Sequence, residues 1–350
     1  MAEALLERMR TVLSEHAPDK MYAATAKMAG LRITVESDDR DLFDDFYVAF
    51  GGPEPKEGRI DIRSDVHVEV RAGLQPGFGW FCISGANDLV VDGREFSFAI
   101  DRKQGPYEAL AVDEPGWTAF GFRDTGKLAF AFRDRECLFT LGPYWRRSFI
   151  WFLFWRFLRT RSDAIFFHAS ALGIFGEGTI FAGPPGNGKS TTAVALAARG
   201  HNFLSDEVAC YLPATGELLP YRRPVGFKPG PRAAAARDSP HRPTPRQVAR
   251  DGVLRIEIET LFPVEPAQAW PLRRVVFLRG FAEKPLLERI EPGRAEIVEL
   301  QPLMSSFLNA PHSQRVFELT RLLSTSKVYK LHLGEPDETA AYIEEALGRE

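Results

Sequence analysis

The feature that most constrains this chain is the segment 179–200, TIFAGPPGNGKSTTAVALAARG, which reads apolar, then glycine-rich, then helical. Residues 183–190 satisfy the spacing G-x-x-x-x-G-K-[ST]. With glycine at about 7% of residues, a chance match in a chain of this length is on the order of one percent. The β-type run GTIF precedes the loop, and helix formers ending at Gly200 follow it. A strand, a glycine loop and a helix in that order predict a phosphate-binding loop.

The residue types in this loop suit a nucleoside triphosphate. Glycines let successive backbone N–H groups point inward at a helix N-terminus, where they form a nest for the β-phosphate. Lys189 is expected to bridge β- and γ-phosphate oxygens, and Ser190 to present its hydroxyl to Mg²⁺. We therefore expect a site that uses ATP and Mg²⁺. The predicted nucleotide-binding residues are Gly183, Pro184, Pro185, Gly186, Asn187, Gly188, Lys189, Ser190 and Thr191.

Two further elements near the loop carry titratable side chains. Asp206 and Glu207 end a short apolar run in HNFLSDEVACYLP, on the strand expected directly after the loop's helix. Adjacent residues on a strand point to opposite faces unless a bend redirects one, so one acid can hold the metal while the other faces an acceptor hydroxyl. Upstream, FFHASAL places His168 on a predicted strand. A single histidine in an apolar strand is more often a core residue than a functional one.

Residues 166 to about 212 resemble the core of the HPr kinase/phosphorylases and their HPr-kinase-like relatives, and the similarity extends through PATGELLPYRRPVGFKPG. His168 falls on the family's strand histidine, Lys189 and Ser190 on its loop, and Asp206 and Glu207 on its double aspartate, with Glu in place of the second Asp. The resemblance implies a phosphoenolpyruvate-carboxykinase-like nucleotide-binding fold that transfers a γ-phosphoryl group to a serine hydroxyl. It also implies that Asp206 accepts the hydroxyl proton and that His168 orients or tunes Asp206. Ser190, Glu207 and Asp206 would surround Mg²⁺.

Basic residues downstream are candidates for balancing charge on the transferred phosphoryl group. Arg222, Arg223 and Lys228 are the main candidates, and Arg273 and Arg274 are further ones; a structural role fits each of them as well. Residues 229–252 are rich in Pro, Ala and Arg, which predicts a flexible loop, with an ordered phosphate or substrate lid as the alternative.

The length of 350 residues favours two domains. Residues 1–145 predict a β-rich, largely antiparallel domain with strands such as LRITVES and two hairpins, one turned at Asp92-Gly93 and one at 124–126. Residues 146–350 alternate strands and helices, which predicts an α/β, HPr-kinase-like P-loop kinase domain. Its later elements are a strand at 273–281, a helix or helix pair at 305–326, a strand at 327–334 and a closing helix at 336–347.

Composition excludes some classes of protein. A net charge of −3 argues against a general nucleic-acid binder, and the three cysteines have no metal-binding spacing. No apolar run reaches the roughly 18 residues of a membrane span, and the acidic, amphipathic N-terminus does not resemble a signal sequence. The aromatic segment 145–161 predicts a buried helix or an interfacial one. A cytoplasmic protein is expected.

The expected function is a Mg²⁺- and ATP-dependent kinase that phosphorylates a hydroxyl, a serine of a protein or peptide or a small-molecule alcohol. The alternative is a nucleotide-gated regulatory module that binds a partner with little or no phosphoryl transfer. Expected partners are ATP and the hydroxyl acceptor, with a second copy of the chain as a further candidate.

Overall fold

A computed structural model describes residues 20–37, 40, 43, 56–57, 163–227, 253–304 and 312–349, together with the backbone of six strands between residues 66 and 132. The chain divides into two compact units. The first unit is Met1–Lys27 with Leu31–Phe154, and the second is Met28–Gly30 with Trp155–Glu350. The expected domain boundary at 145/146 stays a prediction, because the residues around it lie outside the described part of the chain.

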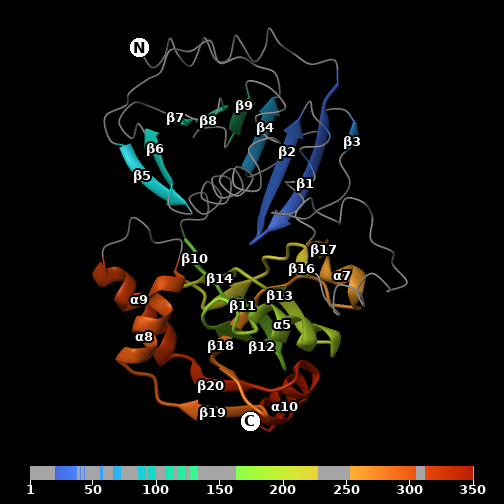
Figure 1. Cartoon of the computed structure of the whole chain (residues 1–350), viewed down its shortest axis with the longest axis vertical. Coiled ribbons are helices and arrows are strands. Elements are labelled where there is room, and N and C mark those ends of the chain that lie inside the picture. The colour runs from blue at the N-terminus through green and yellow to red at the C-terminus, as the bar shows by residue number, and fades with distance from the viewer. Residues whose placement is uncertain are drawn as a thin grey trace. The chain divides into compact units, whose positions relative to one another are not determined.

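The first unit contains a seven-stranded sheet of order β3-β1-β2-β4-β9-β8-β7 and a separate pair, β5–β6 (Figure 1). The strands are β1 (Tyr22–Met28), β2 (Leu31–Ser37), β3 (Lys56–Glu57), β4 (Val66–Arg71), β5 (Ala86–Val91), β6 (Arg94–Ala99), β7 (Tyr107–Val112), β8 (Trp117–Phe122) and β9 (Lys127–Phe132).

Most described strand pairs of this unit are antiparallel, as expected, but β4 is an exception. β4 runs parallel to both of its neighbours, β2 and β9, whereas β8 is antiparallel to β7 and β9. Parallel neighbours require a long connection, and the chain between β4 and β9 carries four further strands. Residue alternation predicts a half-buried strand, but it does not predict the direction of that strand's neighbours.

Both predicted hairpins are confirmed. Val91 pairs with Arg94, which leaves Asp92 and Gly93 as the two-residue connection, and β8 pairs antiparallel with β9. The aromatic segment 145–161 lies outside the described residues.

The second unit is mixed α/β and is built on a large mixed sheet. The strand order is β10-β14-β15-β18-β12-β11-β13, with β20 paired to β18 and β19. Only β12–β18 and β18–β20 are parallel among the described pairs of this sheet. The strands are β10 (Ile165–Phe167), β11 (Ser170–Ile174), β12 (Glu177–Ala182), β13 (Asn202–Ser205), β14 (Ala209–Leu212), β15 (Glu217–Leu219), β18 (Trp270–Phe281), β19 (Leu286–Ile290) and β20 (Lys327–Leu333).

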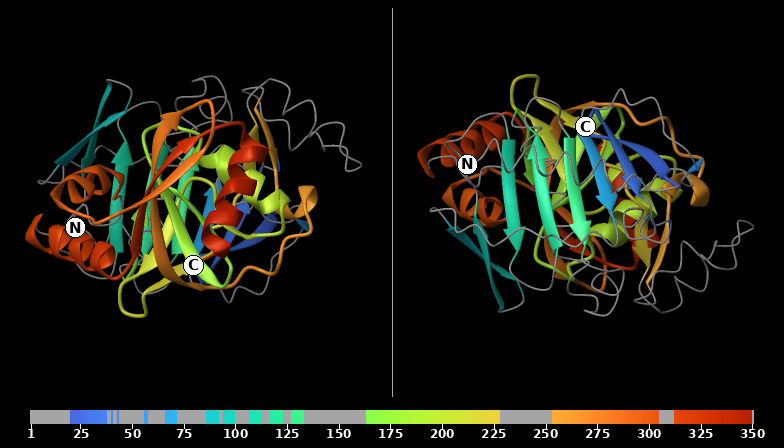
Figure 2. Two further views of the ribbon diagram at one scale, coloured as in Figure 1. Left: turned by 90° about the horizontal axis from the view of Figure 1, so that it is seen from below. Right: turned by 90° about the horizontal axis from the view of Figure 1, so that it is seen from above.

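Helices cover both faces of this sheet, as the view along it in Figure 2 shows. Leu300 of α8 and Leu319, Leu322 and Leu323 of α9 pack into one core, while α5 and α10 pack into another that includes Leu196 and Ile343. The helices are α5 (Lys189–Ala198), α8 (Arg294–Leu300), α9 (His312–Ser324) and α10 (Pro336–Gly348). A smaller pair, β16 (Val225–Phe227) and β17 (Leu254–Ile256), precedes α7 (Ile258–Leu261).

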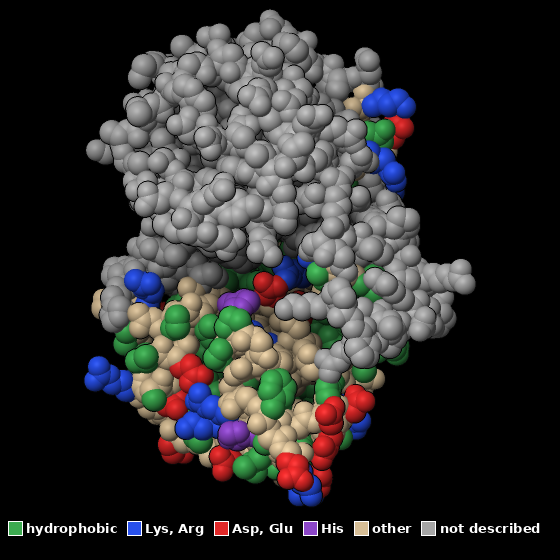
Figure 3. Space-filling model, viewed as in Figure 1, with side chains coloured by type: hydrophobic (Ala, Val, Ile, Leu, Met, Phe, Trp, Pro, Cys, Tyr) green, Lys and Arg blue, Asp and Glu red, His purple; other side chains and the backbone are tan. Residues whose placement is uncertain are grey.

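These elements confirm the predicted loop helix, the strand at 273–281 and the last strand and helix. Pro336 lies in the first turn of α10 together with Asp337 and Glu338, where negative charge complements the helix dipole. On the face seen in Figure 3, acidic side chains gather where α10 lies. No described helix combines the length and apolar character that a bilayer crossing needs.

Candidate active site

The glycine loop connects the end of β12 to the start of α5. Gly186 and Gly188 have φ angles of +87° and +77°, a region that residues with a side chain rarely adopt. A Cβ on Gly188 would also lie 2.8 Å from Leu333 Cδ1. The backbone conformation therefore favours glycine at position 188, and the Leu333 side chain of β20 lies directly against it.

The amine of Lys189 lies inside this loop. Lys189 Nζ donates hydrogen bonds to the carbonyl oxygens of Gly183, at 2.8 Å, and Pro184, at 3.1 Å. The residue is buried, and this burial lowers the pKa of Lys189. A cation is thus held at the position where phosphate oxygens would need one.

Two side-chain hydrogen bonds tie the loop to the strands on either side of β12. Ser170 Oγ, on β11, donates to the Lys189 carbonyl at 3.2 Å. Asn187 Nδ2 donates to the Leu278 carbonyl of β18 at 3.3 Å. Ser170 was not predicted from the sequence, where it stands out only as a polar residue within an apolar run.

Asp206 and Glu207 lie in a bend between β13 and β14, which corrects the prediction that they end a continuous strand. Ser205 Oγ accepts hydrogen bonds from the backbone N–H groups of Glu207, at 3.3 Å, and Val208, at 2.9 Å, and so stabilises the bend. Ser190 Oγ donates to the Asp206 carbonyl oxygen at 3.3 Å. The acid bend therefore touches the first turn of the loop's helix.

The Asp206 carboxylate is buried in a setting unusual for a charge. Only 5% of the residue is exposed, and Oδ1 has no hydrogen-bond partner among the described residues. Burial raises the pKa of Asp206, and the Arg223 charge and the Ser190 hydroxyl partly offset this effect. A carboxylate that is destabilised in this way is a better proton acceptor than one in water.

Arg223 is the candidate cation that the structure brings to the acids. Its guanidinium forms an ion pair with Glu207, and its Nε lies 3.8 Å from Asp206 Oδ1. Asp206, Glu207, Ser190 and Arg223 therefore form one cluster beside the glycine loop.

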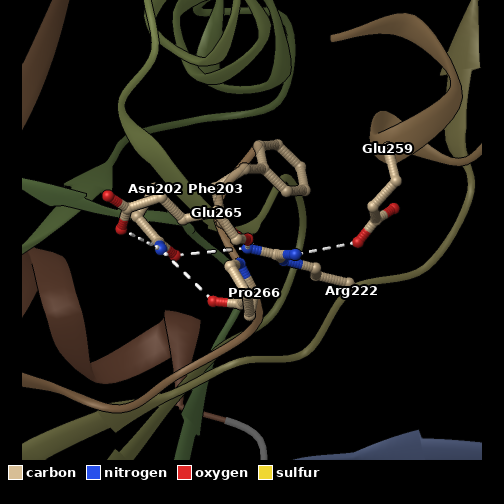
Figure 4. A network of polar contacts seen from close by, with 6 residues as sticks. All are labelled: Asn202, Phe203, Arg222, Glu259, Glu265 and Pro266. Atoms are coloured by element: carbon tan, nitrogen blue, oxygen red, sulfur yellow. Dashed lines mark hydrogen bonds and ion pairs between the residues drawn. The ribbon is translucent and has the colours of Figure 1, made fainter. Parts of the chain in front are cut away.

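Arg222 points elsewhere, and its place among the phosphate-balancing candidates is corrected. Its guanidinium donates to the carbonyl oxygens of Phe203, at 2.6 Å, and Glu265, at 2.9 Å, and to Asn202 Oδ1 at 3.2 Å (Figure 4). It also pairs with Glu259 at 2.9 Å. Adjacent residues in an extended segment project in opposite directions, so Arg222 joins β13 to the 259–266 segment while Arg223 faces the acids.

Replacing Arg222 with alanine is expected to lower the free energy of unfolding by about 2–3 kcal/mol, because the charged hydrogen bonds to the partly buried Phe203 carbonyl and Asn202 Oδ1 are lost together with those to Glu259 and Glu265. Denaturant titration measures this loss. Lysine at position 222 should restore little of it, since an ammonium cannot supply the planar, forked set of donors. A change below about 0.5 kcal/mol, the usual range of surface substitutions, would contradict the structural role.

The other basic candidates do not join the cluster in the described part of the chain. Arg274 is buried, pairs with Glu177 at 2.5 Å and donates to the Ile174 carbonyl at 3.1 Å, which is a structural role near the start of β18. Arg273 is exposed beside it. Lys228 and the 229–252 loop lie outside the described residues.

His168 does not lie within a strand, as was predicted, but in the bend that separates β10 from β11. Its backbone N–H donates to the Leu303 carbonyl at 2.8 Å, and its side chain is exposed. Partial desolvation and the charges of Lys189 and Arg223 lower the pKa of His168. Its imidazole is therefore mostly neutral near pH 7, because the two nearby positive charges disfavour its protonation.

The residues present fit a magnesium ion that is held jointly with a nucleotide. In the described residues no three His, Cys, Asp or Glu side chains converge as metal ligands. Mg²⁺ beside phosphates commonly uses one or two carboxylates, a hydroxyl and water. Asp206 Oδ1, which accepts no hydrogen bond from the described residues, supplies that kind of donor set together with Ser190 and Glu207.

Comparisons with known proteins identify no family for this chain. No family model matches it, and no curated protein matches it either. Among solved structures it is similar to the Hpr(Ser) kinase/phosphatase from Coxiella burnetii, at 15% identity over 53% of this chain and 94% of that one, with a TM-score of 0.25. A score this low does not establish a shared fold.

Proposed function

We propose that the protein is a Mg²⁺- and ATP-dependent phosphotransferase that moves the γ-phosphoryl group to a hydroxyl, with a serine of a protein or peptide as the acceptor. The observation that carries the proposal is the buried Asp206 carboxylate against the first turn of the glycine-loop helix, with a raised pKa and an Oδ1 that accepts no hydrogen bond from the described residues. A cytoplasmic site of action and an HPr-kinase-like kinase domain over residues 146–350 are part of the same proposal.

The roles follow from chemistry and position. Backbone N–H groups of residues 186–190 bind the phosphates, and the Lys189 amine exchanges its loop carbonyls for β- and γ-phosphate oxygens. Mg²⁺ bound at Ser190, Asp206 and Glu207 would neutralise charge on the phosphates. Arg223 lies beside both acids and is placed to offset charge on the phosphoryl group.

In the transfer step the acceptor oxygen forms a bond to the γ-phosphorus while the bond from that phosphorus to the bridging oxygen of ADP breaks. The acceptor proton passes to the Asp206 carboxylate, and ADP leaves. Neutral His168 accepts or donates one hydrogen bond, which orients the acceptor hydroxyl without adding a third positive charge.

A buried carboxylate with one oxygen that lacks a hydrogen-bond donor among the described residues supports phosphoryl transfer over passive nucleotide binding. Such a group is unfavourable for folding, and a module that only sensed nucleotide would gain nothing from keeping it. The alternative is a nucleotide-gated regulatory module, and a test must distinguish phosphoryl transfer from nucleotide binding alone.

The test is incubation of the protein and Mg²⁺ with γ-labelled ATP and pools of proteins or peptides. We expect label in an acid-stable, alkali-labile phosphoester, as phosphoserine is. α-Labelled ATP should transfer nothing, and EDTA should abolish the signal. Nucleotide binding with no labelled acceptor would favour the regulatory module, whereas release of free phosphate alone would indicate an ATPase.

A further inference from the structure

The two sides of the glycine loop differ in chemistry. β12 lies between β11 and β18 in the sheet. The acid bend follows β13, beyond β11 on one side, whereas the other side is formed by β18 and β20. The parallel strands β12, β18 and β20 end at the same edge, so the ends of β18 and β20 lie beside the loop.

β18 extends past the end of β12 and reaches the level of the loop. Ala182, the last residue of β12, pairs with Phe277, which leaves 278–281 beyond it. A Cβ on Gly183 would lie 3.1 Å from Leu278 Cβ, and one on Gly188 would lie 3.8 Å from the tip of the Phe281 ring. Phe281 is therefore a neighbour of the phosphate cradle on the side away from the acids.

The Phe281 ring is exposed although its backbone is held in place. Phe281 is 70% exposed, the highest value among the large apolar residues described as exposed. The pairing of β18 with β20 shifts between Leu278 and Phe281, and Gly280 in that bulge has a φ of +90°. Phe281 pairs with Leu333, and the next N–H, from Ala282, donates to the Leu333 carbonyl at 2.7 Å. Bulges commonly redirect a side chain next to a functional site.

We propose that Phe281 is the surface on which the base of the bound nucleoside triphosphate stacks. The inference rests on the proposed function, because it takes residues 183–190 as the phosphate cradle. The γ-phosphate must point to Asp206 for transfer, so the nucleoside leaves the cradle toward the opposite side. On that side the large exposed apolar side chains are the aromatic Phe281 and the aliphatic Leu286 of β19. An aromatic face binds any flat base, so it supplies affinity rather than a choice between bases.

The experiment compares binding of ATP and of inorganic tripolyphosphate, each with Mg²⁺, by calorimetry. Phe281→Ala is expected to weaken ATP binding about tenfold to a hundredfold, because stacking on an aromatic ring contributes on that scale. Tripolyphosphate has no base, so its affinity should not change. Phe281→Trp should retain ATP affinity, because indole also stacks.

Phe317→Ala is the matched control, since Phe317 of α9 is 63% exposed and lies outside both cores. It should alter neither affinity. Unchanged ATP affinity in Phe281→Ala would overturn the inference, as would an equal loss for ATP and tripolyphosphate, which would mean that Phe281 only supports the cradle. These two results leave the proposed function intact. A wild-type protein that binds neither compound would overturn the proposed function and this inference with it.

Discussion

Asp206→Asn is expected to reduce phosphoryl transfer by about a thousandfold, because an amide cannot accept the acceptor's proton and general-base catalysis contributes 10²–10⁴-fold. Affinity for ATP measured without Mg²⁺ should change little, since the glycine loop and Lys189 are untouched. Single-turnover label transfer and calorimetric ATP binding measure the two effects separately. Transfer within about threefold of the wild-type rate would show that Asp206 is not the base.

The same variant is expected to be more stable than the wild type. The raised pKa means that the folded state disfavours the ionised Asp206, so the wild-type protein loses stability as pH rises through the folded-state value. Asparagine removes that loss. At neutral pH we expect a gain of about 1 kcal/mol, seen as a Tm higher by about 2–4 °C, and no gain below the unfolded pKa of aspartate.

Glu207→Gln is the matched control for Asp206→Asn. The Glu207 side chain is 41% exposed and already paired with Arg223, so the change should move the free energy of unfolding by less than about 0.5 kcal/mol. It should raise the Mg²⁺ concentration that gives half the maximal rate. A stability gain equal to that of Asp206→Asn would contradict the assignment of the buried, strained charge to Asp206.

Lys189→Met is expected to weaken the binding of ATP and of tripolyphosphate by about a hundredfold or more, because a buried phosphate would lose its charged partner. Methionine fills a similar length of apolar space but cannot donate to Gly183 and Pro184, so a small loss of stability should accompany the effect. Calorimetry with ATP and with tripolyphosphate measures the two affinities.

Lys330→Met controls for the loss of one positive charge. Lys330 lies on β20 and pairs with Glu296 at 3.8 Å, away from the loop hydrogen bonds. It should leave both affinities unchanged. Equal losses in the two variants would mean that net charge, rather than the position of Lys189 in the loop, governs binding.

The local elements of this protein could be predicted from sequence, because their cause is local. The loop 183–190 forms from the conformational freedom of its glycines, and the helix that follows forms from helix formers ending at Gly200. The β5–β6 hairpin follows from Asp92-Gly93 between two strand patterns. Sequence alone therefore suffices to predict the glycine loop and the residue types around it.

Only the tertiary structure decided which of these residues meet. Contacts with elements distant in sequence determine three features of the fold. They set the direction of neighbouring strands, the bend that carries Asp206, and the break between β10 and β11 at His168. Arg222 and Arg223 are chemically identical neighbours, yet one joins β13 to residues 259–266 and the other faces the acids. Phe281 lies more than ninety positions after the loop. It gives no motif signal, because strand pairing and a bulge, rather than its own sequence, bring it to the edge where β12 ends.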